Sequence, residues 1–234
     1  MDQDDLNLLE GLKREVKVCK ICKGIGYLPG TIKCACYDKY EKTLKYIVAN
    51  IPRVYWNFKL EQYVGNHGVT GMIKNYTTDI SAAKHKGVGL LLYGTKGTGK
   101  TALLSCVMRS IVEKNFSADY TLLAKIFRAF MDHDNAFINH IHQVDFLAID
   151  SVDQAYLSAN TDYMEKLFDE IFRYRFIRKK PMIISYSNSR EQLAQDLGTS
   201  IVSLFNECLI PILVAGEDYR PKLAKTLTMR LKEK

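Results

Sequence analysis

Eight consecutive residues near the middle of the chain have the types and spacing of a phosphate-binding loop. They are Gly94, Thr95, Lys96, Gly97, Thr98, Gly99, Lys100 and Thr101, which spell G-x-x-x-x-G-K-T. Glycines accept positive φ angles and carry no Cβ, so backbone N–H groups can crowd around a phosphate. In such a loop the lysine reaches the β- and γ-phosphates and the threonine hydroxyl binds Mg²⁺. The sequence therefore predicts ATP and Mg²⁺ as ligands.

The segments on either side of this loop supply the context that the motif needs. The apolar run 88–93 reads as a buried strand, and the apolar run 102–108 reads as the start of a helix. A helix that begins at the loop adds its positive dipole end to the phosphate site. A glycine-rich turn with a chance lysine is the alternative, and the flanking elements favour the phosphate site.

Two further apolar runs end in polar residues that could complete an ATPase site. The run 144–150 ends in Asp150, a carboxylate placed to hold Mg²⁺ beside the loop. In many such ATPases the next residue is a second acid that polarises the attacking water, but here it is Ser151. Asp153 is the acid that could substitute for it. The run 182–188 ends in Asn188, at the position of a γ-phosphate sensor.

Four of the six cysteines lie before residue 37 and have metal-ligand spacing. They are Cys19, Cys22, Cys34 and Cys36, a C-x-x-C pair and a C-x-C pair. Four thiolates at this spacing suit tetrahedral Zn²⁺, and the glycines and proline between the pairs predict a short hairpin. A redox C-x-x-C with two bystanders is the alternative. A redox pair would begin a helix after a strand, whereas this one follows the helical stretch 6–18, so zinc is favoured.

Length and charge limit the class of protein. The 234 residues are enough for one medium domain with a small appendage, and the net charge of +7 suits a polyanionic partner. No apolar run approaches the roughly 20 residues that a membrane span needs. The N-terminus is acidic, unlike a signal peptide. We expect a cytoplasmic protein without a membrane partner.

The remaining pattern predicts an α/β fold. The segments 118–122 and 209–214 read as two further strands, and helices are expected at 124–143 and 162–178. Pro211 favours an edge position for the last strand. The expected architecture is a parallel five-stranded sheet flanked by helices. It divides into residues 1–50, a zinc-binding module with a linker helix, and residues 51–234, the ATPase domain.

Three groups of residues leave alternatives open. The aromatic segment 54–60 could line an adenine pocket or pack in the core. The segment 173–180 interleaves basic and aromatic residues, so it could bind single-stranded DNA by charge and stacking, or be an ordinary cation-rich helix end. The three histidines of 124–143 are expected at the surface. A further basic group forms the C-terminal tail from Lys222 onward.

The order of these motifs resembles that of the DnaC/DnaI-type replicative helicase loaders, which are AAA+ ATPases. The resemblance spans residues 19–220. Besides the cysteines, the phosphate-binding loop and Asp150, it rests on the following residues: Ile51-Pro52, Tyr55, Tyr174-Arg175, Ser187-Asn188 and Gly216-Glu217-Asp218-Tyr219-Arg220.

The resemblance implies a role in replication initiation. Such a loader binds the DnaB-type replicative helicase through its zinc module and helps deliver it to single-stranded DNA, with the ATP state controlling release. It would work as a homo-oligomer or as an assembly on the helicase ring. The residues with implied catalytic roles are Lys100, Asp150, Asn188 as sensor one and Arg220 as a sensor-two-like residue.

The chain departs from the family pattern in the groups that support hydrolysis. No arginine or lysine occurs from Glu191 to Tyr219, although the family places an arginine finger in the region of residues 200–207. With Ser151 also non-acidic, we expect a weak ATPase, or one completed in trans by the helicase, by DNA, or by Arg175 or Arg178 of a neighbour. So few residues follow Arg220 that we expect no helical lid.

Two other functions fit the same residues. An IstB-type transposition helper shares the ATPase core and would bind duplex DNA, but the cysteine module favours the loader. A non-hydrolysing adaptor that sequesters a host helicase or its loader is compatible with the missing catalytic groups.

Overall fold

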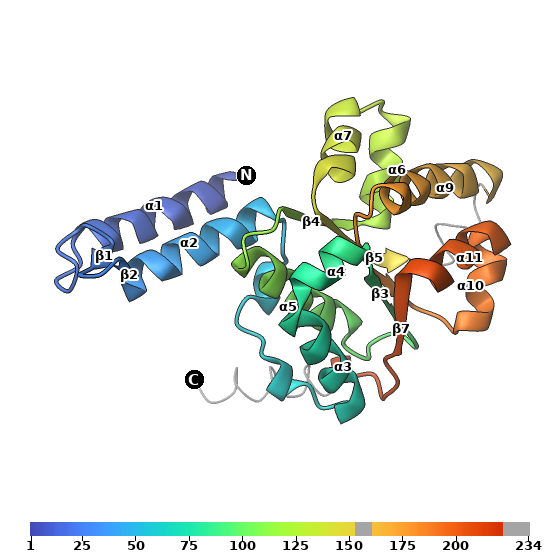
Figure 1. The fold of residues 1–234 in the computed structure, drawn as a ribbon, viewed down its shortest axis with the longest axis horizontal. Coiled ribbons are helices and arrows are strands. Elements are labelled where there is room, and N and C mark those ends of the chain that lie inside the picture. Colours follow the sequence, from blue (N-terminus) through green and yellow to red (C-terminus); the bar gives the residue numbers. More distant parts are fainter. Residues whose placement is uncertain (153–160, 222–234) are drawn as a thin grey trace.

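The computed structural model describes residues 1–152 and 161–221, without the side chains of residues 161–165. An N-terminal helical hairpin projects from a larger α/β body (Figure 1). The second acid suggested by sequence, Asp153, lies outside the described residues, as does the basic tail from Lys222 onward.

The hairpin consists of helices α1 (Gln3–Lys17) and α2 (Ala35–Val48), joined at the tip by the short antiparallel strands β1 (Tyr27–Leu28) and β2 (Ile32–Lys33). Leu9, Leu12 and Val16 form the buried stripe of α1. Asp2 caps α1, where the first-turn N–H groups have no partner within the helix. The predicted helices and the predicted hairpin are confirmed here.

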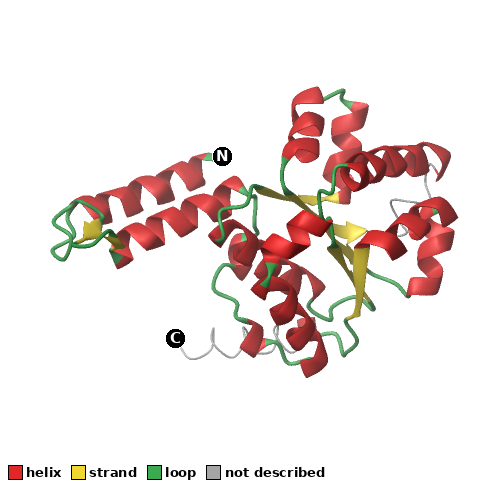
Figure 2. Ribbon diagram, in the orientation of Figure 1, coloured by secondary structure: helices red, strands yellow, loops and turns green. Residues whose placement is uncertain are grey.

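Five parallel strands form the sheet of the larger body (Figure 2). They are β3 (Gly89–Tyr93), β4 (Ala118–Leu122), β5 (Phe146–Val152), β6 (Met182–Tyr186) and β7 (Leu209–Leu213), in the spatial order β4-β5-β6-β3-β7. The three central strands, β5, β6 and β3, are buried on both faces and therefore read as largely apolar runs. Strand β7 lies at an edge, as Pro211 predicted.

Helices cover both faces of the sheet, and alternate strand residues serve the two cores. Leu90 and Leu92 point into the core shared with α3 (His67–Thr78), α4 (Ile80–Lys86) and α5 (Lys100–Glu113). Leu91 points into the opposite core. That second core is closed by α6 (Leu123–Met131), α7 (Asn135–Gln143), α9 (Thr161–Ile177), α10 (Arg190–Leu197) and α11 (Thr199–Cys208). Two 3₁₀ turns, η1 (Arg53–Tyr55) and η2 (Leu60–Gln62), connect the hairpin to the body.

The prediction of one helix over 124–143 was wrong. The chain leaves α6 at Met131, His133 adopts a left-handed φ of 53°, and the Asp134 side chain caps α7 by accepting from the Phe137 N–H. The expectation of surface histidines also failed for His142, which is buried and stacks on Tyr174.

Within the described residues, only a short segment follows β7, and no helical lid domain is present there. None of the helices in the described ranges is long and apolar enough to cross a bilayer.

Candidate nucleotide-binding site

The phosphate-binding loop leaves the carboxyl end of β3, between the ends of its two neighbours. Strand order places β6 on one side of β3 and β7 on the other. Accordingly, the Gly94 N–H donates to the carbonyl of Asn188, which follows β6, at 3.1 Å. The Tyr219 N–H, beyond β7, donates to the carbonyl of Gly97 at 3.1 Å. The sheet thus gathers the predicted residues at the edge where ligands bind in open α/β folds.

The loop glycines are required by both conformation and packing. Gly94, Gly97 and Gly99 have φ angles of 138°, 79° and 91°. A Cβ on Gly94 would lie 2.5 Å from the Val214 carbonyl oxygen, and one on Gly97 would lie 2.0 Å from a carboxylate oxygen of Asp218. The segment after β7 therefore packs directly on the loop.

Lys100 is buried and its side chain turns back into the loop. Its Nζ donates to the carbonyl oxygens of Gly94 at 2.8 Å and Thr95 at 2.6 Å. Helix α5 begins at this lysine, so Thr101 lies in the first turn. The ammonium and the first-turn N–H groups therefore face the same small volume, which suits the phosphates of a nucleotide.

Asp150 is buried at the end of β5, and both of its oxygens accept hydrogen bonds. The Tyr120 hydroxyl donates to Oδ2 at 2.6 Å, and the Ser185 hydroxyl donates to Oδ1. Ser185 in turn accepts from the Ser151 N–H at 3.0 Å. Burial, followed by the charge of Asp150, raises the pKa of Tyr120, so this hydroxyl remains a donor. The carboxylate is fixed in direction, and its remaining lone pairs fit a Mg²⁺ ligand.

Sequence reasoning missed Tyr120 and Ser185. They lie on β4 and β6, the strands that flank β5. Ser185 interrupts the apolar start of β6, which is a signal that could have identified it, whereas Tyr120 lies between Asp119 and Thr121 and carries no such signal. Ser151 adopts a left-handed φ of 57° directly after Asp150, at the position where a second acid is usual.

Tyr55 lies within electrostatic reach of both Asp150 and Arg220. The pKa of Tyr55 is raised, first by burial and then by the charge of Asp150, while the charge of Arg220 opposes the rise. The rest of the aromatic segment 54–60 serves packing. Trp56 and Phe58 lie against the core, and the Trp56 Nε1–H donates to the Ile51 carbonyl at 2.8 Å.

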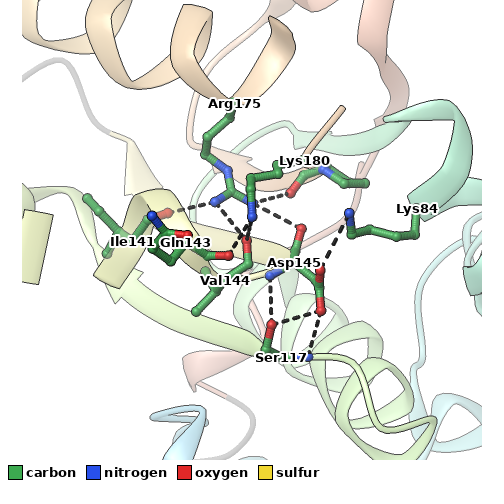
Figure 3. Close-up of polar contacts among 9 residues, drawn as sticks. Lys84, Ser117, Ile141, Gln143, Val144, Asp145, Arg175 and Lys180 are labelled. Atoms are coloured by element: carbon green, nitrogen blue, oxygen red, sulfur yellow. Dashed lines mark hydrogen bonds and ion pairs between the residues drawn. The ribbon is translucent and has the colours of Figure 1, made fainter. Parts of the chain in front are cut away.

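Arg175 does not reach a neighbouring molecule, which corrects the suggestion that it acts in trans. It is fully buried, and its guanidinium donates to the carbonyl oxygens of Ile141 (2.6 Å), Val144 (3.2 Å), Asp145 (3.1 Å) and Pro181 (3.1 Å) (Figure 3). Burial lowers its pKa. A guanidinium still stays protonated in proteins, and four carbonyl acceptors stabilise that form. Arg175 is therefore a structural residue.

The aromatic side chains beside Arg175, Tyr174 and Phe176, are packed against other side chains. Tyr174 is stacked on His142 at 4.1 Å, and the Arg178 guanidinium lies 3.8 Å from the centre of the Tyr174 ring. Phe176 packs against the core. These rings are therefore not free to stack on bases, although the exposed Arg178 retains its charge.

An arginine that sequence reasoning passed over contacts the helix where the finger was expected. Helix α11 carries no lysine or arginine, but Arg190, at the start of α10, donates to the Asn206 side chain of α11. The two helices fold back on one another, so a residue far away in sequence reaches the surface of α11.

The four N-terminal cysteines form one cluster at the tip of the hairpin. Their sulfur atoms lie within 4.8 Å of one another, with Cys19 and Cys34 3.9 Å apart and Cys22 and Cys36 3.6 Å apart. A tetrahedral zinc with Zn–S bonds of about 2.3 Å needs edges of about 3.8 Å. The N–H groups of Cys22 and Ile21 lower the pKa of Cys19 to about 6, whereas burial and the neighbouring thiols raise the pKa of Cys36 to about 12. The donor set and spacing fit Zn²⁺ better than a single redox pair.

Comparison with known proteins agrees with this geometry. The model of the bacterial DnaA ATPase domain matches residues 58–211, more than half of the chain. The chain belongs to the bacterial DnaA ATPase domain family. Membership of this family supports nucleotide binding at the phosphate-binding loop, residues 94–101. No curated protein sequence matches it.

Solved structures place the DnaA-family chain among the AAA+ proteins. The DnaC helicase loader is 25% identical, with a TM-score of 0.59, over 70% of this chain and 100% of that chain. DnaI is 23% identical, with a TM-score of 0.61, and the match covers 72% of this chain and 94% of the DnaI chain. AMPPCP-bound DnaA from Aquifex aeolicus is 22% identical, with a TM-score of 0.57, and the match covers 79% of this chain and 56% of the DnaA chain. The resemblance to DnaC/DnaI-type loaders and the predicted AAA+ fold are confirmed.

Proposed function

We propose that this chain is an ATP-binding helicase loader that binds the DnaB-type replicative helicase and helps deliver it to single-stranded DNA. The observation that carries the proposal is the structural match to the DnaC helicase loader, which covers 70% of this chain and the whole of that solved chain. Residues 1–50 would be the helicase-binding module and residues 51–234 the ATPase domain.

Nucleotide binding follows from the arrangement at the carboxyl edge of the sheet. The loop N–H groups and Lys100 would hold the β- and γ-phosphates, and Thr101 and Asp150 would hold Mg²⁺, which would neutralise phosphate charge. Asn188, whose carbonyl accepts from the Gly94 N–H, would contact the γ-phosphate. Arg220 lies across the site on the β7 side, where it could respond to the same phosphate.

Hydrolysis by the isolated chain should be slow. Ser151 offers no carboxylate to polarise water, and α11 has no cation for a neighbour's γ-phosphate. With Arg175 buried, Arg190 is the best-placed candidate for a finger in trans, because it is exposed on the surface that α10 and α11 share. An arginine finger contributes roughly 10³–10⁵ to the rate, so assembly with a partner would control turnover.

The tip of the hairpin has the character of a protein-binding surface. Its exposed apolar residues are Val18, Ile21, Ile25 and Ile32, between 62% and 77% accessible. Zn²⁺ held by the four cysteines would fix the loops that present them, since so short a segment has little core of its own. Such a patch suits an apolar partner surface, and we assign it to the helicase.

A loading assay tests the proposal. The replicative helicase is incubated with circular single-stranded DNA, ATP and either the wild-type chain or Lys100→Ala, and DNA-bound helicase is measured after gel filtration. The wild-type chain should increase the amount bound, and Lys100→Ala should not. An absence of increase with the wild-type chain, together with tight binding to duplex DNA, would favour the transposition helper instead.

The non-hydrolysing adaptor remains the second candidate because of Ser151. It predicts a stable helicase complex with no ATP turnover even when DNA is present. Turnover by the complete mixture would exclude it.

A further inference from the structure

Five cations gather at the amino edge of the sheet, opposite the nucleotide site. We call this group the amino-edge patch, and its members are Lys84, Lys86, Arg178, Lys179 and Lys180. Two of them end helix α4, and three belong to the turn between α9 and β6. Strands β3 and β6 begin beside them, so the length of a strand, about 15 Å, separates the patch from the phosphate-binding loop.

The fold, rather than the sequence alone, brings these residues together. A Cβ on Gly87, at the end of α4, would lie 2.9 Å from the Lys179 Cα, so the two backbones are in close contact. The Lys84 ammonium lies 3.4 Å from Asp145, and Lys180 donates to the Gln143 and Val144 carbonyls (Figure 3).

The cations repel one another. The pKa of Lys180 is lowered, first by burial and then by the charges of Arg175, Lys84 and Arg178, which Asp145 only partly offsets. Asp145 also accepts from the Ser117 N–H and hydroxyl, which help to keep it ionised, so this single carboxylate offsets only one of the five cations. The potential left at the surface is positive, while Lys86, Arg178 and Lys179 are exposed.

We propose that the amino-edge patch binds the phosphodiester backbone of single-stranded DNA. This inference rests on the proposed function for the choice of partner. Closely spaced cations favour a ligand with several anionic groups in series, and a nucleic-acid strand supplies them. Because the Tyr174 ring is already stacked on His142 and contacted by the Arg178 guanidinium, recognition would occur by charge without base stacking, and so without sequence preference.

Binding of a fluorescein-labelled oligothymidylate, followed by anisotropy over a series of salt concentrations, tests the patch. The variant is Lys86→Gln/Lys179→Gln. The control is Lys13→Gln/Lys20→Gln, which removes the same charge from exposed positions in the hairpin. The patch variant should bind roughly tenfold more weakly at about 0.1 M salt, and its slope of log K against log salt should fall by about 1.4. Nucleotide affinity should stay unchanged, which verifies the fold.

Three results would overturn the inference, and they have different meanings. If the wild-type chain binds oligothymidylate and both variants bind it with the same affinity, DNA is still the partner but the amino-edge patch is not its binding site. If the wild-type chain binds no DNA at low salt, the DNA part of the proposed function fails with it. If the patch variant loses affinity for polyglutamate but not for oligothymidylate, the partner is an acidic protein.

Discussion

The guanidinium of Arg175 joins backbone carbonyls from the end of α7, the start of β5 and the start of β6. Lysine at this position could not satisfy the same acceptors from one point charge. We expect Arg175→Lys to lower the free energy of unfolding by about 2–3 kcal/mol, because buried carbonyls lose their donors. Arg178→Lys, on the exposed side of Tyr174, should cost under about 1 kcal/mol. Equal decreases in the free energy of unfolding for the two variants, measured by urea denaturation, would contradict the structural role of Arg175.

The Tyr120 hydroxyl gives a second prediction at the residue scale. Tyr120→Phe leaves one oxygen of the buried Asp150 without its donor, so stability should fall by about 1–2 kcal/mol. The freed carboxylate should also weaken the effect of Mg²⁺ on nucleotide affinity, measured with a fluorescent ATP analogue with and without Mg²⁺.

Tyr76→Phe is the matched control, because it removes another buried hydroxyl, one that donates to the Val88 carbonyl at 2.8 Å. Its stability should fall similarly while its response to Mg²⁺ stays unchanged. A Mg²⁺ response that is unchanged in Tyr120→Phe as well would show that the hydroxyl does not position Asp150.

At the scale of elements, the zinc module can be separated from the ATPase site. We expect Cys34→Ser to lose the zinc and helicase binding but to keep ATP affinity, because the cluster lies at the tip of the hairpin, away from the larger body. Cys106→Ala removes a thiol outside the cluster and should keep one zinc per chain by atomic absorption. Retention of helicase binding by the zinc-free Cys34→Ser variant would contradict the assignment of helicase binding to the zinc module.

The sequence predicted elements better than it predicted the contacts between them. The sequence located all five strands, and the central β5, β6 and β3 stood out as apolar runs because the sheet buries both of their faces. The break at His133 was missed because residues on both sides of it have helical composition, and only the Asp134 cap marks it. In the sequence, Arg175 is one of several cations in the segment 173–180. Only the fold shows its burial, because α7 and the starts of β5 and β6 surround its guanidinium. Arg190 joins α11 only through the fold of the α10–α11 pair.

At the scale of the whole molecule, catalysis should depend on assembly. The purified chain alone should turn over ATP slowly, and helicase with DNA should raise the rate. Arg190→Ala should reduce the stimulated rate by at least roughly tenfold without changing ATP affinity, while Arg128→Ala, at an exposed position of α6, should leave that rate unchanged. Robust turnover by the isolated protein, in a coupled ADP assay, would contradict this account.

The most direct test of the central claim is size-exclusion chromatography with light scattering on a mixture of this protein and its replicative helicase, with and without ATP. The loader assignment predicts a stable complex whose mass or stability changes with nucleotide. The absence of a complex in every nucleotide state would contradict it.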